Sequence, residues 1–356
     1  MLYQGLLRPL FFKLDCETAH HLAHLAGVLA GPVWPVLSGF FTYSGDDLKQ
    51  NLAGVELANP VGLAAGFDKN GLLAPSLGSL GFGFAEIGSV TARASKGNPK
   101  PRCFRLPADE ALINRMGLNG DGADVVAARL VRCRFSLPLG INIAKTNDPD
   151  IQGDAAVEDI LYTYRQVRDL PVSFLTINTS CPNTTDGIME ETRELAIILH
   201  EIAKDSGRRL PVFVKLSPDS TPQLIEDIVA CASETGVAGL ICGNTTVSRA
   251  GLITDGAALS RIGNGGLSGR PLKPLALALV RAVFKLKTAE QVIVACGGIS
   301  SGDDAYDFVR AGANAVQLYT GLVYQGPTLP RDINSQLSRL LKRDKITLQE
   351  AVGISA

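Results

Sequence analysis

The sequence has no excess of charge of either sign. Its 34 Lys and Arg residues balance 35 Asp and Glu residues over 356 positions. A protein that follows a nucleic-acid phosphate backbone needs a stripe of basic residues, and a net charge near zero gives no sign of one. We therefore expect no nucleic-acid partner.

Paired cysteines are also absent. The seven cysteines are scattered, form no CxxC motif and follow no secretory signal, a pattern typical of reduced cytosolic thiols. Disulfides and zinc fingers are not expected. His20 and His24 could share a helix face, but no third or fourth ligand stands nearby at metal-site spacing, so we expect no metal.

Uninterrupted apolar runs of about 18 residues, the length that spans a bilayer, do not occur. The most apolar stretch, 22–41, is broken by residues such as His24, Pro32 and Pro35. The sequence therefore predicts no membrane-spanning helix.

What the chain does contain is a regular alternation of two patterns after residue 60. Short, β-branched apolar runs alternate with segments of helical spacing, as in parallel βαβ units. Eight such units predict a (β/α)₈ TIM barrel, an α/β fold, with an open doubly wound sheet as the alternative. The expected strands are 61–66, 82–90, 139–145, 174–180, 211–217, 239–246, 292–299 and 315–321, and the expected helices include 121–133, 154–168, 191–206, 221–235, 271–287 and 302–311.

Residues 1–45 differ from the barrel that we assign to 46–356. Leucines and phenylalanines at helical spacing predict two short amphipathic helices, the second capped by Asp15. They form either a hairpin that packs on the barrel or a helix pair that rests in a membrane surface and admits an apolar substrate.

Amides and lysines follow the predicted strands, where barrel enzymes place their chemistry. Carboxylates are almost absent there, which disfavours a divalent-metal site or a glycosidase pair. Asn side chains donate and accept hydrogen bonds, as the amide edges of a pyrimidine-like ring require, and lysines can pair with a carboxylate, a phosphate or an anionic cofactor. The glycines of CGGIS at 296–300, together with QLYTG at 317–321, suggest a phosphate site.

Cys181 stands at the end of a predicted strand, in the motif NTSCPN. Most cysteines are buried and structural, which we expect of the other six. A thiol at this position can act as a general base if a nearby cation or dipole lowers its pKa. No histidine stands at a strand end to take that role.

These motifs together resemble one family over nearly the whole chain. AAGFDKNG at 64–71, INRMGLNG at 113–120, INTSCPNT at 177–184 and GGLSGRPL at 265–272 are similar to the dihydroorotate dehydrogenases. The N-terminal segment, including LDCETAHHLA, resembles the quinone-binding extension of the membrane-associated class, class 2.

The resemblance implies oxidation of (S)-dihydroorotate to orotate by flavin mononucleotide (FMN), with a quinone as final acceptor, in de novo pyrimidine biosynthesis. It also implies a monomer bound peripherally to a membrane. Because no transit peptide stands ahead of the helix pair, we expect the cytosolic face of the cytoplasmic membrane. The residues at flavin-contacting positions are Ala64, Ala65, Gly66, Ser89, Asn142, Asn178, Lys215, Gly269, Gly298, Tyr319 and Thr320. Those at substrate-contacting positions are Lys69, Asn114, Arg115, Met116, Gly117, Leu118, Asn178, Asn183, Asn244 and Thr245, and those near the quinone path are His20 and Arg105.

The chain departs from the class 2 pattern at the base, where Cys181 replaces the usual serine, as in the soluble classes that use fumarate or NAD. Gly243 and Leu118 replace a threonine and a phenylalanine. The alternatives are therefore a fumarate- or NAD-linked dihydroorotate dehydrogenase, a uracil or thymine dehydrogenase, a flavin-free phosphate-binding barrel and a non-catalytic membrane scaffold.

Overall fold

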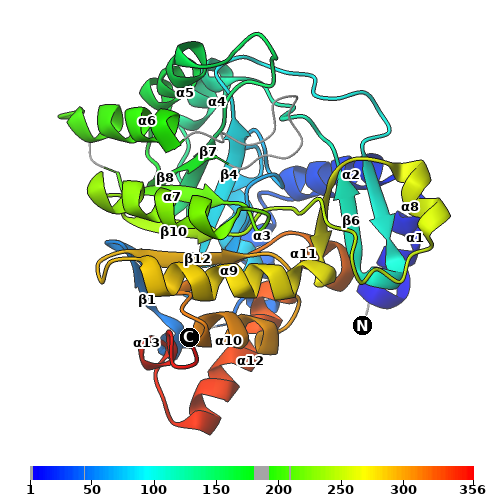
Figure 1. The fold of residues 1–356 in the computed structure, drawn as a ribbon. Helices are drawn as coiled ribbons and strands as arrows, with labels where there is room; N and C mark the ends of the chain where they lie inside the picture. Colours follow the sequence, from blue (N-terminus) through cyan, green and yellow to red (C-terminus); the bar gives the residue numbers. More distant parts are fainter. Residues whose placement is uncertain (1–2, 44, 180–191, 208–209) are drawn as a thin grey trace.

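The computed structural model describes residues 3–43, 45–179, 192–207 and 210–356. Eight parallel strands close into a barrel in the order β10-β12-β13-β3-β4-β7-β8-β9. This closed sheet confirms the predicted TIM barrel and excludes an open doubly wound sheet (Figure 1). The strands are β3 (Val61–Leu63), β4 (Phe84–Val90), β7 (Leu139–Ile143), β8 (Phe174–Asn178), β9 (Val212–Leu216), β10 (Gly239–Cys242), β12 (Val292–Cys296) and β13 (Ala315–Leu318).

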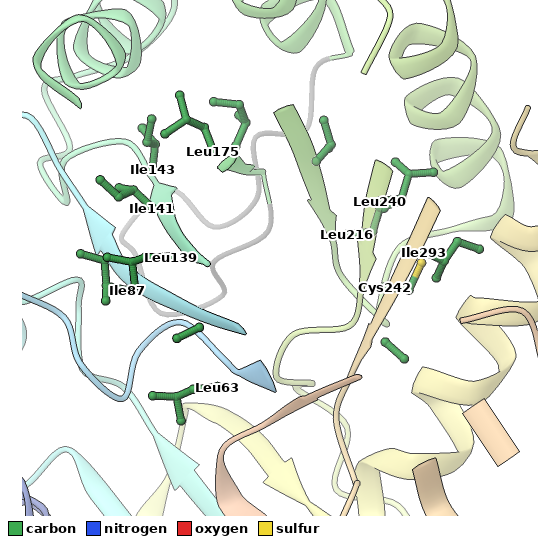
Figure 2. Packing of buried hydrophobic residues seen from close by; sticks show 14 of the residues in the cluster. Leu63, Ile87, Leu139, Ile141, Ile143, Leu175, Leu216, Leu240, Cys242 and Ile293 are labelled. Atoms are coloured by element: carbon green, nitrogen blue, oxygen red, sulfur yellow. The ribbon is translucent and has the colours of Figure 1, made fainter. Parts of the chain in front are cut away.

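Helices surround the barrel because each strand carries a second apolar face that must be buried. Figure 2 shows Leu175, Leu240 and Ile293 on the side of their strands that faces the helices, where they belong to the main hydrophobic core. Each helical segment expected from the sequence contains a helix. The helices after β4 are α4 (Ala123–Leu130), α5 (Asp154–Val167), α6 (Thr192–Lys204), α7 (Pro222–Glu234), α8 (Gly256–Ile262), α9 (Lys273–Leu286), α10 (Gly302–Arg310), α11 (Thr320–Gln325), α12 (Leu329–Asp344) and α13 (Leu348–Ala351).

Two small sheets lie outside the barrel ring. The hairpin of β1 (Gln50–Leu52) and β2 (Val55–Leu57) packs against the amino-terminal end of the barrel interior. An antiparallel sheet joins β5 (Cys103–Leu106), β6 (Ala111–Asn114) and β11 (Gly266–Gly269). The motif at 265–272 thus contains a strand, followed by the 3₁₀ turn η5 (Arg270–Leu272). Further short turns are η2 (Asp46–Leu48), η3 (Ala74–Leu80) and η4 (Pro107–Asp109).

The N-terminal residues form helices beside the barrel (Figure 1). The predicted first helix is a π-turn η1 (Tyr3–Leu7) that continues into α1 (Arg8–Phe12), and the second is α2 (Cys16–Leu29). Asp15 caps α2 as expected, accepting bonds from the N–H groups of Glu17 and Thr18 at 3.0 and 3.2 Å. A third helix, α3 (Trp34–Phe41), was not predicted separately.

Within the described ranges no single helix is long and apolar enough to cross a membrane. Helices α2 and α3 meet that requirement only when taken together, and the chain bends by 117° between them.

Phenylalanine rings fill the barrel interior near the amino-terminal ends of the strands, because glycines face them on the neighbouring strands. Phe84, Phe174 and Phe213 are fully buried, and the ring of Phe174 contacts the other two edge-on at 6.3 and 5.4 Å between centroids. A Cβ atom at Gly140 would lie 2.1 Å from the ring of Phe174. The glycine is therefore required for the packing of this layer.

We predict that Gly140→Ala lowers the free energy of unfolding by about 1–3 kcal/mol, because the new methyl group overpacks the interior. Urea denaturation followed by circular dichroism would measure the change. Gly256→Ala is the matched control, since nothing lies within 4 Å of a Cβ atom there. Equal urea midpoints for the two variants would contradict the requirement for glycine beside the ring of Phe174.

Candidate functional site

A cavity of about 620 Å³ lies between the carboxyl ends of the barrel strands and the N-terminal helices. This volume is in the range of small-molecule and cofactor sites. Most of the residues selected from the sequence lie on its wall, although they come from widely separated segments. They are His20, Ala64, Ala65, Gly66, Lys69, Ser89, Arg105, Asn114, Met116, Gly117, Leu118, Asn178, Lys215, Asn244, Thr245, Gly269, Gly298, Tyr319 and Thr320.

A buried carboxylate organises the centre of the barrel beneath this cavity. Glu86 on β4 has no exposed surface and accepts hydrogen bonds from the side-chain amides of Asn142 at 2.7 Å and Gln317 at 2.6 Å. These bonds offset the cost of burying the charge. They also hold the amide of Asn142 in one orientation.

The network continues from Asn142 toward the cavity. The hydroxyl of Ser89 donates to the Asn142 carbonyl oxygen, and the amide of Asn178 donates to the Ser89 hydroxyl at 3.1 Å. Ser89 and Asn178 line the cavity, together with Lys215, which is 5% exposed. The cavity floor is thus a rigid polar surface with a lysine beside it.

Three buried polar atoms on residues that line the cavity have no hydrogen-bond partner in the described part of the chain. They are the hydroxyl oxygen of Thr245, the side-chain carbonyl oxygen of Gln317 and the Nε atom of Arg105. Buried polar atoms are nearly always satisfied, so their presence favours a polar ligand at this site. Lys69, on another part of the wall, donates to the Asn119 side-chain oxygen at 2.8 Å.

A line of aromatic rings runs from the N-terminal helices into the cavity. The ring of His20 on α2 contacts Phe67 at 5.0 Å between centroids, and Phe67 contacts Tyr319 at 5.6 Å. Burial, reinforced by the nearby positive charge of Lys69, lowers the pKa of His20 to about 4. His20 is therefore neutral near pH 7, as an apolar ligand path requires. Burial also raises the pKa of Tyr319, so its hydroxyl stays protonated.

The N-terminal helices supply the apolar side of the cavity. Residues of α2 that repeat at helical spacing, including Ala19, Ala23 and Ala26, line it together with Phe12 and Trp34. Arg105 on β5 lies over the Phe12 ring at 4.8 Å and donates to the Leu14 carbonyl oxygen at 2.8 Å. It joins the helices to the small antiparallel sheet at the cavity wall.

Two of the selected residues are not on the wall. Asn142 lies behind Ser89, as described above, and reaches the cavity through it. The Arg115 guanidinium is held by the carbonyl oxygens of Ile262 and Asn264 at 2.6 and 2.8 Å. Cys181 and Asn183 lie outside the described residues. The roles assigned to all selected residues stay predictions.

Glu86 and Gln317 were missed by the analysis of the sequence, although the signal was present. In FAEIGSV the side chains alternate, so Glu86 shares the inward face with Phe84, while Ala85 and Ile87 belong to the outer core. An acid on the inward face of a barrel strand needs buried partners. That requirement would have selected Asn142 and Gln317.

In the ranges that the structure describes, no three residues among His, Cys, Asp and Glu are grouped so that they could hold a metal ion. The donors on the cavity wall are instead amides, hydroxyls and lysines, which suit an organic ligand with amide and anionic groups.

Fold and cavity together define a ligand-binding (β/α)₈ barrel with its site at the carboxyl ends of the strands. Comparison with known proteins narrows this class. The family described as dihydroorotate dehydrogenase matches residues 47–341, and the chain belongs to that family.

Full-length relatives carry the same description. The chain is 43% identical to the dihydroorotate dehydrogenase (quinone) of Natronomonas pharaonis over 99% of each chain, and 41% identical to that of a Roseiflexus species over 98% of each. A crystal structure of the Eimeria tenella enzyme in complex with ferulenol superposes with a TM-score of 0.82 at 33% identity, covering 97% of this chain and 98% of that one.

The depressed pKa of His20 predicts a pH-dependent stability. As pH falls below the unfolded value near 6.5, the unfolded chain binds a proton that folded His20 does not bind until about pH 4, so stability is lost in this window. The loss between pH 7 and pH 5 is about 2 kcal/mol. Urea midpoints at both pH values for the natural chain and His20→Gln would test this, and the variant should lose correspondingly less. An equal loss in both would show that His20 does not titrate in this way.

Proposed function

We propose that this chain oxidises (S)-dihydroorotate to orotate with FMN as hydride acceptor and passes the electrons to a membrane quinone, in de novo UMP biosynthesis. The observation that carries the proposal is that one cavity joins the amide- and lysine-lined strand ends to the apolar inner face of the N-terminal helices. Membership of the dihydroorotate dehydrogenase family supports it independently.

The flavin ring would lie on the polar floor. Bound there, FMN supplies a two-electron acceptor that can take a hydride. The amide of Asn178 and the hydroxyl of Ser89 would meet its polar edge, and the ammonium group of Lys215 would stabilise negative charge on it. The unpartnered carbonyl oxygen of Gln317 and hydroxyl of Thr245 fit a ligand that both donates and accepts hydrogen bonds.

The phosphate of the cofactor would be held where the backbone is most open. Gly269 and Gly298 have positive φ angles of 98° and 73°, and both line the cavity, as does Thr320. Backbone N–H groups in such conformations suit an anion. The remaining residues proposed for flavin contact are Ala64, Ala65, Gly66, Tyr319 and, through Ser89, Asn142.

Dihydroorotate would bind with its carboxylate at Lys69 and its amide edges at Asn114, Asn178, Asn183, Asn244 and Thr245. A charge-assisted bond to the ammonium group orients the ring. Cys181 would then remove a proton from C5 while a hydride leaves C6. Met116, Gly117 and Leu118 would close the pocket beside Lys69.

The N-terminal helices have two apolar faces, which supports a role at a membrane. The inner face lines the cavity, while Leu6, Leu10, Leu29, Val36 and Phe40 point outward with 54–81% of their surface exposed. Ten of the eighteen large exposed apolar side chains in the described chain lie between residues 6 and 40. Such a concentration marks an interaction surface, and we propose that a monomer rests with it in the cytosolic face of the membrane and admits quinone past His20 and Arg105.

The direct test is anaerobic mixing of the purified protein with dihydroorotate, following flavin absorbance, and then addition of a soluble quinone. We expect bleaching and quinone-driven recovery. Cys181→Ala should bleach about 10²-fold more slowly with flavin still bound. Recovery with fumarate alone would favour the soluble-class alternative. Absence of bleaching with dihydroorotate but bleaching with dihydrouracil would favour a pyrimidine dehydrogenase.

Lys69→Ala should weaken orotate binding by about 1.5–3 kcal/mol, because a buried carboxylate would lose its charged partner. Titration of the flavin spectrum with orotate measures this affinity. Lys49→Ala, at a lysine whose side chain is 66% exposed, is the matched control and should bind as the natural chain does. If Lys69→Ala bound orotate with unchanged affinity, Lys69 would not be the partner of the substrate carboxylate.

Leu29→Glu combined with Val36→Glu should weaken binding to phospholipid vesicles by at least about tenfold, because both side chains leave the apolar surface and gain charge. Vesicle flotation measures the bound fraction. Val125→Glu with Val131→Glu is a matched control, since both residues are exposed at α4, on the outside of the barrel. Equal loss in both double variants would place the membrane contact elsewhere.

A further inference from the structure

Two cysteines that the proposed reaction does not use meet beside the cavity. Cys16 begins α2 and Cys103 begins β5, and their sulfur atoms are 2.8 Å apart. This is close for two unbonded sulfur atoms, while a disulfide bond is about 2.05 Å long. Both residues line the cavity. In the described part of the chain no other two cysteine sulfurs are in hydrogen-bond contact.

The surrounding contacts hold the two thiols together. Next to Cys16, Glu17 forms a bidentate pair with Arg102, at 2.7 and 3.2 Å, and Arg102 is 6% exposed. On the other side Arg105 donates to the Leu14 carbonyl oxygen. These noncovalent bonds hold the start of α2 against β5 on both sides of the thiol pair and so keep the two sulfur atoms close.

We propose that Cys16 and Cys103 are a redox pair that closes into a reversible disulfide by exchange with a small-molecule disulfide. One thiolate attacks the small disulfide, forming a mixed disulfide and releasing one small thiol. The second cysteine then displaces the other small thiol. The two cysteines lose two electrons and two protons overall, and one small disulfide becomes two thiols.

The electrostatics around the pair favour this exchange. The hydrogen bond from Cys103 lowers the pKa of the Cys16 thiol, and the Arg105 guanidinium acts in the same direction. The thiolate is the form that attacks a disulfide. Cys16 is buried and Cys103 is partly exposed, but both line the cavity, which is the side from which a small disulfide reaches them.

The bond would change how the N-terminal helices move. Helix α2 carries His20 and much of the apolar cavity wall, whereas β5 belongs to the sheet fixed to the barrel. A covalent tie between them restricts widening of the cavity on this side. Resting on the proposed function, the oxidised enzyme should reduce quinone more slowly than the thiol form and oxidise dihydroorotate at the same rate.

Incubation of the folded holoenzyme with oxidised glutathione, followed by alkylation and non-reducing peptide mapping, tests the pair directly. We expect a linked peptide that contains Cys16 and Cys103 and disappears on treatment with dithiothreitol. Cys16→Ser and Cys103→Ser should each abolish it. Cys133→Ser is the matched control and should retain it, because that thiol bonds to the Arg129 carbonyl oxygen on α4, away from the cavity. Separate glutathione adducts on Cys16 and Cys103 without a link would overturn the proposal.

The functional consequence has its own measurement. Stopped-flow rates of flavin reduction by dihydroorotate and of flavin reoxidation by a soluble quinone are compared before and after oxidation, with recovery by dithiothreitol. Slower reoxidation that requires both cysteines supports the tie. A linked peptide with unchanged reoxidation would overturn its effect on quinone. Failure of dihydroorotate to bleach the flavin at all would instead count against the proposed function, while the peptide map would still report on the thiol pair.

Discussion

The hydrogen bonds that Glu86 accepts from Asn142 and Gln317 lie at the level where the barrel interior changes from apolar rings to polar side chains. Below this level lie the rings of Phe84, Phe174 and Phe213, and above it lie hydroxyls, amides and a lysine. A buried carboxylate tolerates few alternative arrangements, because each lost hydrogen bond leaves a charge unsatisfied. Three strands, β4, β7 and β13, are tied at this point. The orientation of Ser89 and Asn178 at the cavity floor depends on that tie.

The barrel could be predicted from the sequence because its signal is local and repeated. Each strand is a short apolar run and each helix an amphipathic segment, so the alternation predicted a barrel, with an open doubly wound sheet as the alternative. The sheet of β5, β6 and β11 was not predicted. Its third strand, β11, pairs with β6 from more than a hundred residues away. Pairing at that distance leaves no periodic trace.

The site, like the fold, could be predicted from the sequence only in part. The lysines and amides at strand ends were found because the fold places all strand ends at one edge. The contact between Cys16 and Cys103 and the path from His20 through Phe67 to Tyr319 could not be found this way. Both depend on how the N-terminal helices pack on the barrel, and helix periodicity predicts an apolar face without identifying its partner.

The packing of phenylalanine rings against glycines inside the barrel limits which substitutions the sequence can accept. Gly62 on β3 lies beside Phe84 as Gly140 lies beside Phe174, with 2.4 Å between a Cβ atom and the ring. A side chain at either glycine becomes tolerable only when the facing ring is smaller, and a smaller ring alone leaves a void. The free energies of the two changes are therefore not additive. Across homologous chains the two positions should therefore vary together. A larger residue in place of the glycine should occur only with a smaller residue in place of the phenylalanine.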